Sequence, residues 1–290
     1  MNIIIIRIML LSVLLGLLNA CTMGQITVRA SMPMIEGGIV AMNRETDLKL
    51  AKAAIPANMG MLEGMLVKDP ENQVLHEFAA QGYYGYSYGF VEDQDRKRAS
   101  KLYYRGFRHG KAALAEYDLN EAQLEGRLDA LQAAVNRLDE DAVPALFWTA
   151  SNWARWIDMN RDSARSLAQM PRAEMLMRRV LELDENYFLS GAHLFFGVYY
   201  GSRSPMMGGD FARSEKHFNL ARKNTGNKVL LADLLQAQYL ERQRFDRAAF
   251  HKHLQQVVDA PADLYPAQAL INAIAKQKAV ELLNREDEWF

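Results

Sequence analysis

The sequence predicts an all-α protein built from helical-hairpin repeats, and three observations lead to this class. Residues 21–290 contain 67 Ala and Leu but 25 Val, Ile and Thr, so helix-favouring residues outnumber strand-favouring ones. Apolar residues recur at helical spacing, as between Leu124 and Leu138. The sequence also matches itself at an offset of 115 residues, which is typical of repeat architectures.

The N-terminal segment, residues 1–20, is predicted to be a signal peptide. Its apolar run after Arg7 covers 11 residues, whereas a membrane-spanning helix needs about 20. Residues 18–21 (LNAC) resemble the lipobox of bacterial lipoproteins and contain the single cysteine of the chain. We therefore expect a periplasmic protein lipidated at Cys21, and by resemblance to Gram-negative sorting Thr22 favours the outer membrane. A plain secretory signal or an uncleaved anchor is the alternative.

The rest of the chain is divided into a tether and one folded domain. Residues 21–43 show no sustained period, so we expect an irregular lipidated tether. Residues 44–290 are predicted to form a single α-helical domain, in which Asn120 and Gln123 indicate a capping box at a helix start. The expected helices are 44–55, 57–68, 72–92, 95–117, 120–138, 142–158, 171–184, 187–201, 210–224, 228–243, 246–259 and 267–287.

The match at an offset of 115 residues relates two helical hairpins. Its identities are Leu66/Leu181, Asp69/Asp184, Gly82/Gly197, Tyr84/Tyr199, Ser87/Ser202, Asp95/Asp210, Arg98/Arg213 and Lys101/Lys216. Each copy has a Gly on its first helix and a small-x₃-aromatic-x₂-small pattern on its second, at Ala99, Tyr103 and Gly106 and at Ser214, Phe218 and Ala221. This pattern resembles the tetratricopeptide (TPR) repeat and implies a compact TPR-like superhelix. The spacing predicts longer inter-helix loops than a standard TPR has.

Three aromatic-rich segments, residues 81–90, 147–160 and 195–210, are the most unusual part of the composition. Ligand pockets are lined mainly by aromatic side chains with a few polar groups, so we predict that these segments converge on a cavity or partner surface. Ordinary core packing is the alternative. The candidate lining residues are Tyr83, Tyr84, Tyr86, Trp148, Asn152, Trp153, Trp156, Asn160, His193, Tyr199 and Tyr200.

The same segments carry a more specific resemblance. Residues 81–93, 147–162 and 191–210 are similar to the signature segments of the TatT family, TPR-like lipoproteins associated with tripartite ATP-independent periplasmic (TRAP) transporters. The resemblance extends from about Met59 to the C-terminus. It implies a non-catalytic accessory protein that binds the transporter's periplasmic substrate-binding subunit and a small hydrophobic ligand. Association with a second copy is left open, and a TPR scaffold lipoprotein for envelope or outer-membrane assembly is the alternative.

Other functional classes are disfavoured by charge and by motif spacing. The 34 Lys and Arg against 35 Asp and Glu give no basic excess for binding nucleic acid. Residues 85–89 (GYSYG) fit the serine-hydrolase pattern G-x-S-x-G, but that pattern functions on a strand-to-helix turn, so a hydrolase ranks third. The H-E-x-x-H spacing fails at Ala80, and His251 and His253 project about 200° apart on a helix. We therefore expect no cofactor and no metal site.

Overall fold

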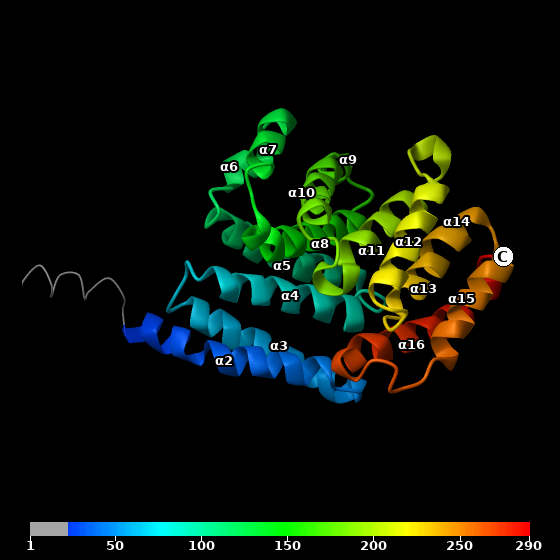
Figure 1. Cartoon of the computed structure of the whole chain (residues 1–290), viewed down its shortest axis with the longest axis horizontal. Coiled ribbons are helices and arrows are strands. Elements are labelled where there is room, and N and C mark those ends of the chain that lie inside the picture. Colours follow the sequence, from blue (N-terminus) through cyan, green and yellow to red (C-terminus); the bar gives the residue numbers. More distant parts are fainter. Residues whose placement is uncertain (1–22) are drawn as a thin grey trace, which may run out of the picture.

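The computed structural model describes residues 23–290, and its regular elements are all helices, which confirms the predicted class (Figure 1). The predicted signal peptide and Cys21 lie outside the described residues. The α-helices are α2 (Met23–Asn43), α3 (Leu48–Leu66), α4 (Gln73–Phe90), α5 (Arg96–Ala115), α6 (Glu121–Glu125), α7 (Leu128–Val135), α8 (Val143–Met159), α9 (Ala164–Leu167), α10 (Met170–Leu183), α11 (Tyr187–Gly201), α12 (Phe211–Asn224), α13 (Leu231–Leu235), α14 (Arg242–Arg244), α15 (Arg247–Asp259) and α16 (Ala269–Leu283). Short 3₁₀ turns cover Glu140–Ala142, Pro205–Met207, Pro266–Gln268 and Glu286–Glu288, and a π-helical segment covers Gln236–Glu241.

Helix α2 replaces most of the expected tether. The expectation of an irregular segment is wrong for residues 23–43, which are helical and lie beside α3 (Figure 1). Pro33 and the two adjacent glycines obscure the helical pattern in the sequence. Val28 and Ile35 are nevertheless buried in a cluster with apolar residues of α3 and α4. This tertiary packing stabilises a helix that local propensity does not predict.

Helix α3 combines two helices that the sequence predicts separately. Residues 44–55 and 57–68 were expected to be divided at Pro56, but the helix continues through this proline. A proline inside a helix removes one backbone hydrogen bond and crowds the preceding turn. Ala51 and Met59 are buried on either side of it, so the packed face of the helix is continuous across the proline.

The long helix predicted from Asn120 is interrupted. Asn120 and Gln123 form the predicted capping box, but the helix ends before Gly126 and α7 starts shortly after it. The Arg172 guanidinium donates hydrogen bonds to the backbone oxygens of Leu124 (3.0 Å) and Gly126 (2.8 Å). These bonds satisfy carbonyl groups that an uninterrupted helix would satisfy internally.

The two related hairpins are α4–α5 and α11–α12. Asp95 and Asp210 cap the second helix of each, and each side chain accepts a hydrogen bond of 2.9 Å from a backbone N–H three residues later. Tyr103 and Phe218 are both fully buried. A Cβ atom on Gly197 would lie 2.7 Å from the ring of Phe218, which is the close approach expected of a TPR-type glycine.

The enlarged spacing has a different cause in each copy. In the first copy the helix expected over 72–92 is confirmed, since α4 continues to Phe90, and only the expectation of a longer inter-helix loop is wrong. In the second copy α11 ends at Gly201, and residues 202–210 form a loop that contains a 3₁₀ turn. The Tyr-rich segment of copy one is therefore rigid helix, which fixes the directions of its side chains.

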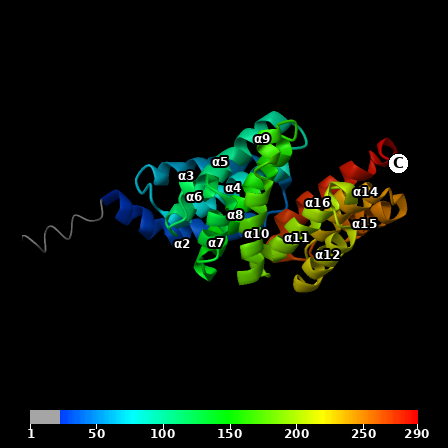
Figure 2. The same ribbon diagram turned by 90° about the horizontal axis from the view of Figure 1, so that it is seen from above.

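The helices are arranged in a ring. Contacts run from α3 through α4, α5, α8, α10, α11, α12, α13 and α15 to α16, and α16 contacts α2 and α3 (Figures 1 and 2). Helix α16 also approaches α4 closely, because a Cβ atom on Gly89 of α4 would lie 2.8 Å from the Ile274 side chain. Within residues 23–290, no helix has the length and apolar character needed to cross a membrane.

Candidate functional site

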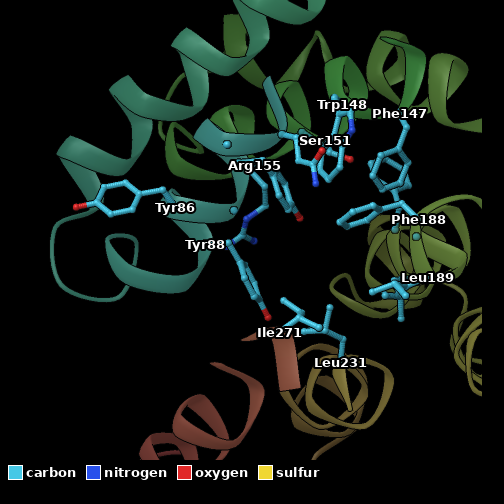
Figure 3. Close-up of a pocket in the computed structure, with 18 of the residues that line it drawn as sticks. Tyr86, Tyr88, Phe147, Trp148, Ser151, Arg155, Phe188, Leu189, Leu231 and Ile271 are labelled. Carbon is cyan, nitrogen blue, oxygen red and sulfur yellow. The ribbon is translucent and has the colours of Figure 1, made fainter. Parts of the chain in front are cut away.

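The ring of helices surrounds a mainly apolar cavity of about 690 Å³ (Figure 3). This volume is typical of small-molecule sites, which have about 300–1,000 Å³. Residues of α2, α3, α4, α8, α9, α10, α11, α13, α16 and the π-helical segment form the wall, so segments distant in sequence meet here. The aromatic residues of the wall are Phe78, Tyr84, Tyr86, Tyr88, Phe90, Phe147, Trp148, Phe188, Phe195, Tyr199 and Tyr239.

Helix α8 divides its side chains between the cavity and the core. Trp148, Ser151 and Arg155 are spaced at i, i+3 and i+7, which places them on one face, and this face lines the cavity (Figure 3). Thr149 and Asn152 lie on another face, which packs against α5. Helix α8 therefore contributes one face to the cavity wall and another to the packing against α5.

Asn152 belongs to the contact between α5 and α8. A Cβ atom on Gly106 would lie 2.2 Å from Asn152 Oδ1, so the two helices meet closely at this point. The Asn152 Nδ2 atom donates to the backbone oxygens of Ala80 (3.0 Å) and Trp148 (2.9 Å). The side chain is fully buried, and it is not part of the cavity wall.

The two other tryptophans of this segment also lie outside the cavity. Trp153 is 1% exposed, its Nε1 atom donates to Gln169 Oε1 (2.9 Å), and its ring centroid is 4.6 Å from that of Phe107. The Trp156 ring packs against Tyr104 at 5.5 Å. Both side chains are therefore explained by packing between helices.

Tyr83 and Asn160 have polar partners away from the cavity. The Tyr83 hydroxyl donates to Glu63 Oε1 at 2.6 Å, and its ring stacks on His109. The Asn160 Nδ2 atom donates to Ser100 Oγ at 2.8 Å. The first contact connects α3 with α4, and the second connects α5 with the end of α8.

His193 and Tyr200 lie in the α11–α12 hairpin. The Nδ1 atoms of His193 and His217 are 2.9 Å apart, and His193 Nε2 is 3.1 Å from Glu185 Oε2. Burial, together with the nearby His193, lowers the pKa of His217 to about 4. The Tyr200 ring stacks on His217 and does not line the cavity.

The structure thus separates the predicted site residues into two groups. The cavity wall contains Tyr84, Tyr86, Trp148 and Tyr199. The other seven candidates lie in the core or take part in contacts between helices, and they are Tyr83, Asn152, Trp153, Trp156, Asn160, His193 and Tyr200.

Several cavity residues were missed from the sequence. Tyr88 follows Tyr84 by four positions, and Arg155 follows Trp148 by seven, so helical spacing from a candidate could have identified both. Phe188 also lines the cavity, and its ring centroid is 4.5 Å from that of Trp148. No periodic signal predicts its position, because it lies in an irregular turn.

This irregular turn consists of three consecutive residues in the left-handed region, Phe188, Leu189 and Ser190, with φ of 42°, 62° and 60°. Each such non-glycine residue costs about 1–2 kcal/mol. The Ser190 hydroxyl donates to the backbone oxygen of Glu185 (3.0 Å) and accepts from Asn224 Nδ2 (3.1 Å), which holds the turn. The turn directs two apolar side chains to the cavity wall.

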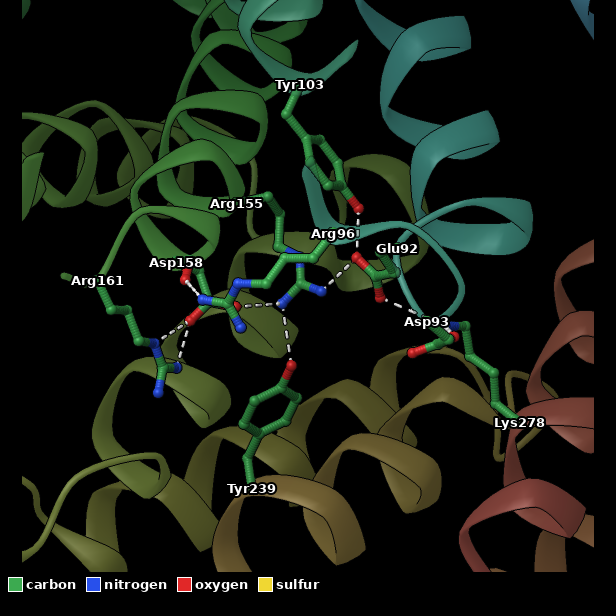
Figure 4. Close-up of polar contacts among 9 residues, drawn as sticks. All are labelled: Glu92, Asp93, Arg96, Tyr103, Arg155, Asp158, Arg161, Tyr239 and Lys278. Carbon is green, nitrogen blue, oxygen red and sulfur yellow. Dashed lines mark hydrogen bonds and ion pairs between the residues drawn. The ribbon is translucent and has the colours of Figure 1, made fainter. Parts of the chain in front are cut away.

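A polar network borders the cavity next to Arg155 (Figure 4). Glu92 accepts hydrogen bonds from the Tyr103 hydroxyl (2.5 Å), from Arg155 and from Lys278 Nζ (3.3 Å). Arg155 Nη1 also donates to the Tyr239 hydroxyl at 2.9 Å. The network joins α5, α8, the π-helical segment and α16, and it therefore contributes to the closure of the ring.

The charges in this network stabilise one another. Burial alone would raise the pKa of Glu92, but the adjacent Arg155 and Lys278 lower it, so the carboxylate stays ionised. Burial alone would lower the pKa of Arg155, but Glu92 holds it well above its usual value. Removing one member of such a buried group leaves the others uncompensated.

The geometry does not support the hydrolase motif. Ser87 lies inside α4, is fully buried, and its Oγ atom has no hydrogen-bond partner among the described residues. A nucleophilic serine needs a base within hydrogen-bond distance and a strained strand-to-helix turn. In residues 23–290, no three His, Cys, Asp or Glu side chains are grouped so that they could hold a metal ion.

Comparison with known proteins places this architecture in one family. A search of the curated proteins finds no match. The family model for the TRAP transporter T-component matches residues 44–290, which include α3 to α16 and all helices of the cavity wall except α2. This match confirms the resemblance predicted from the aromatic segments. The chain belongs to the TRAP transporter T-component family.

Proposed function

We propose that the chain is a non-catalytic accessory component of a TRAP-type transporter, which holds a small hydrophobic ligand in its central cavity. The observation that carries this proposal is the cavity itself, with about 690 Å³ bordered by aromatic and aliphatic side chains from nine α-helices. Apolar ligands gain affinity from burial in such a site, and a few polar groups orient them. Membership of the T-component family supports the role in transport.

The partner in this proposal is the periplasmic substrate-binding subunit of the transporter. Direct exchange of an apolar ligand with that subunit would keep the ligand out of water during the transfer. The protein lies in the periplasm and is attached through a lipidated Cys21 to the outer membrane. Helix α2 begins two residues after this cysteine, so the folded body would sit directly at the membrane surface.

The competing scaffold role is less favoured by the site. A peptide-binding scaffold uses an elongated concave surface with polar groups that bind the peptide backbone. Here the aromatic face of α4 and the Trp148 face of α8 point into the interior of the ring instead. The buried position of Ser87 supports a role without catalysis.

The experiment is a fluorescence titration of the purified protein with N-phenyl-1-naphthylamine, a neutral apolar probe whose emission rises in apolar surroundings. We expect saturable binding with one probe per chain, and a change in probe affinity when the substrate-binding subunit of the same organism's TRAP transporter is added. Absence of saturable binding contradicts the ligand-binding role. If the subunit does not change probe binding and forms no complex with the protein in size-exclusion chromatography, the proposed partner is wrong.

A further inference from the structure

Two hydrogen-bond donors next to the cavity have no partner. The Tyr88 hydroxyl and Arg155 Nε are buried, and neither has a hydrogen-bond partner among the described residues. Both residues belong to the cavity wall, where Figure 3 shows them on the side opposite Phe188. A buried donor without a partner is costly, so such groups in a cavity indicate a ligand that supplies the acceptor.

The charged side chains of the wall are mostly cationic. Three arginines, Arg155, Arg161 and Arg203, line the cavity together with a single carboxylate, Asp158. Asp158 is already paired with Arg155 and Arg161. Among the described residues Arg203 donates to the backbone oxygen of Tyr199 (2.8 Å) and forms no ion pair, and its guanidinium lies 4.1 Å from the centre of the Tyr199 ring. Arg155 and Arg161 are already paired with Glu92 and Asp158, so the uncompensated positive charge of the wall is that of Arg203, and this charge favours an anion.

The two unpartnered groups remain donors near neutral pH. Burial and the adjacent Glu92 raise the pKa of Tyr88 well above its usual value, so its hydroxyl keeps its proton. The Nη atoms of Arg155 are occupied by Glu92, Tyr239 and Asp158, which leaves Nε. An acceptor on the cavity side would complete the hydrogen bonding of both residues.

We propose that the cavity binds an amphiphile whose anionic head group accepts hydrogen bonds from the Tyr88 hydroxyl and Arg155 Nε. Its apolar tail lies along the opposite wall, which contains Phe147, Phe188 and Leu189 (Figure 3). This inference rests on the proposed function, because it assigns a head-group site within the same cavity. A charge-assisted hydrogen bond is strong where water is excluded, so the head group would determine specificity.

The test compares three ligands that share a twelve-carbon chain and differ in the head group: dodecanoate, dodecanol and dodecyltrimethylammonium. Each competes with N-phenyl-1-naphthylamine on the full purified protein at pH 8, below its micellar concentration. We expect dodecanoate to bind at least about tenfold more tightly than the neutral and cationic ligands, because hydrogen bonds to charged groups contribute this much.

The variant Tyr88→Phe removes the hydroxyl and keeps the ring. It should weaken dodecanoate binding about tenfold and leave binding of the neutral probe unchanged. Its melting temperature should not fall, because the hydroxyl makes no hydrogen bond within the described protein. Tyr104→Phe on α5 is the matched control, since this exposed tyrosine does not line the cavity.

The outcomes separate this inference from the proposed function. If dodecanol and the neutral probe bind but dodecanoate is not preferred, or if Tyr88→Phe binds dodecanoate like the parent, the head-group site is overturned and the apolar cavity stands. If neither the probe nor any twelve-carbon ligand binds, the proposed function fails and the inference fails with it.

Discussion

Trp148 and Trp153 lie five positions apart on α8 and are both buried, yet they meet different neighbours. Trp148 borders the cavity, whereas Trp153 is buried against Phe107 and bonded to Gln169. The sequence indicates an aromatic helix but does not say which neighbour each face meets. That assignment depends on where α5 packs, and the glycines of α5 determine this position.

The first prediction at this scale separates core from cavity. Trp153→Ala should lower the free energy of unfolding by about 3–5 kcal/mol, because it empties a packed volume. Tyr84→Ala should cost clearly less, since its ring is half-buried and borders existing space. Chemical denaturation of both variants measures the difference, and N-phenyl-1-naphthylamine binding should be weakened in Tyr84→Ala. Equal destabilisation without a binding effect would place Tyr84 in the core.

A second residue-scale prediction concerns Glu77, which is buried and accepts one hydrogen bond, from Gln73 (3.1 Å). Burial raises its pKa from 4.5 to about 7. Between these values the folded protein holds a proton that the unfolded chain has lost, so this contribution to stability falls as pH rises from 4.5 to 7. Glu77→Gln stays neutral and keeps the acceptor oxygen.

Glu77→Gln should therefore stabilise the protein at pH 8 by up to about 3 kcal/mol and have little effect at pH 4.5. Thermal unfolding of the parent and the variant between pH 4.5 and pH 8 tests this prediction. An equal shift of the melting temperature at both pH values would show that Glu77 does not titrate in this window.

At the scale of elements, small residues determine how closely helices pack. The α5–α8 contact has Gly106 opposite Asn152 and Gly110 opposite Thr149. The TPR-like pattern predicts a small residue at position 106, and the capping box of Asn120 and Gln123 predicts the start of α6. Helix α2 and the continuation of α3 through Pro56 could not be predicted, because both depend on tertiary contacts.

The element-scale prediction uses two helical glycines. A Cβ atom on Gly110 would lie 2.3 Å from Thr149 Oγ1 and 2.8 Å from its Cα atom, so backbone would have to move. Gly110→Ala should destabilise the protein by about 1–3 kcal/mol. Gly60→Ala is the control, because nothing lies within 4 Å of its Cβ position, and it should stabilise by about 0.5–1 kcal/mol. Equal effects in urea denaturation would rule out close α5–α8 packing.

At the scale of the whole molecule, the chain closes on itself through contacts between distant segments. Lys278 of α16 donates to Glu92, and α16 packs on α2 and α3. The repeat offset, the family resemblance and four of the predicted lining residues could be obtained from the sequence. Ring closure could not, because no local pattern specifies that the last helix meets the first. For the same reason, the sequence could not show that seven of the candidate lining residues lie outside the cavity.

The attachment of this body to a membrane is predicted separately. Cys21→Ala should abolish metabolic labelling by a fatty-acid probe and leave the signal uncleaved by the lipoprotein peptidase, because the acylated sulfur is lost. Labelling of parent and variant is compared on the same gel. Equal labelling would show that Cys21 is not the lipidation site.

The central claim is that the cavity holds an apolar ligand, and filling it tests this most directly. Gly85 of α4 lines the cavity and Gly60 of α3 does not, and nothing lies within 4 Å of either Cβ position. Gly85→Leu should lower N-phenyl-1-naphthylamine affinity about tenfold by occupying apolar volume, while Gly60→Leu binds like the parent. Equal affinity in the parent and both variants would contradict a ligand site within the ring.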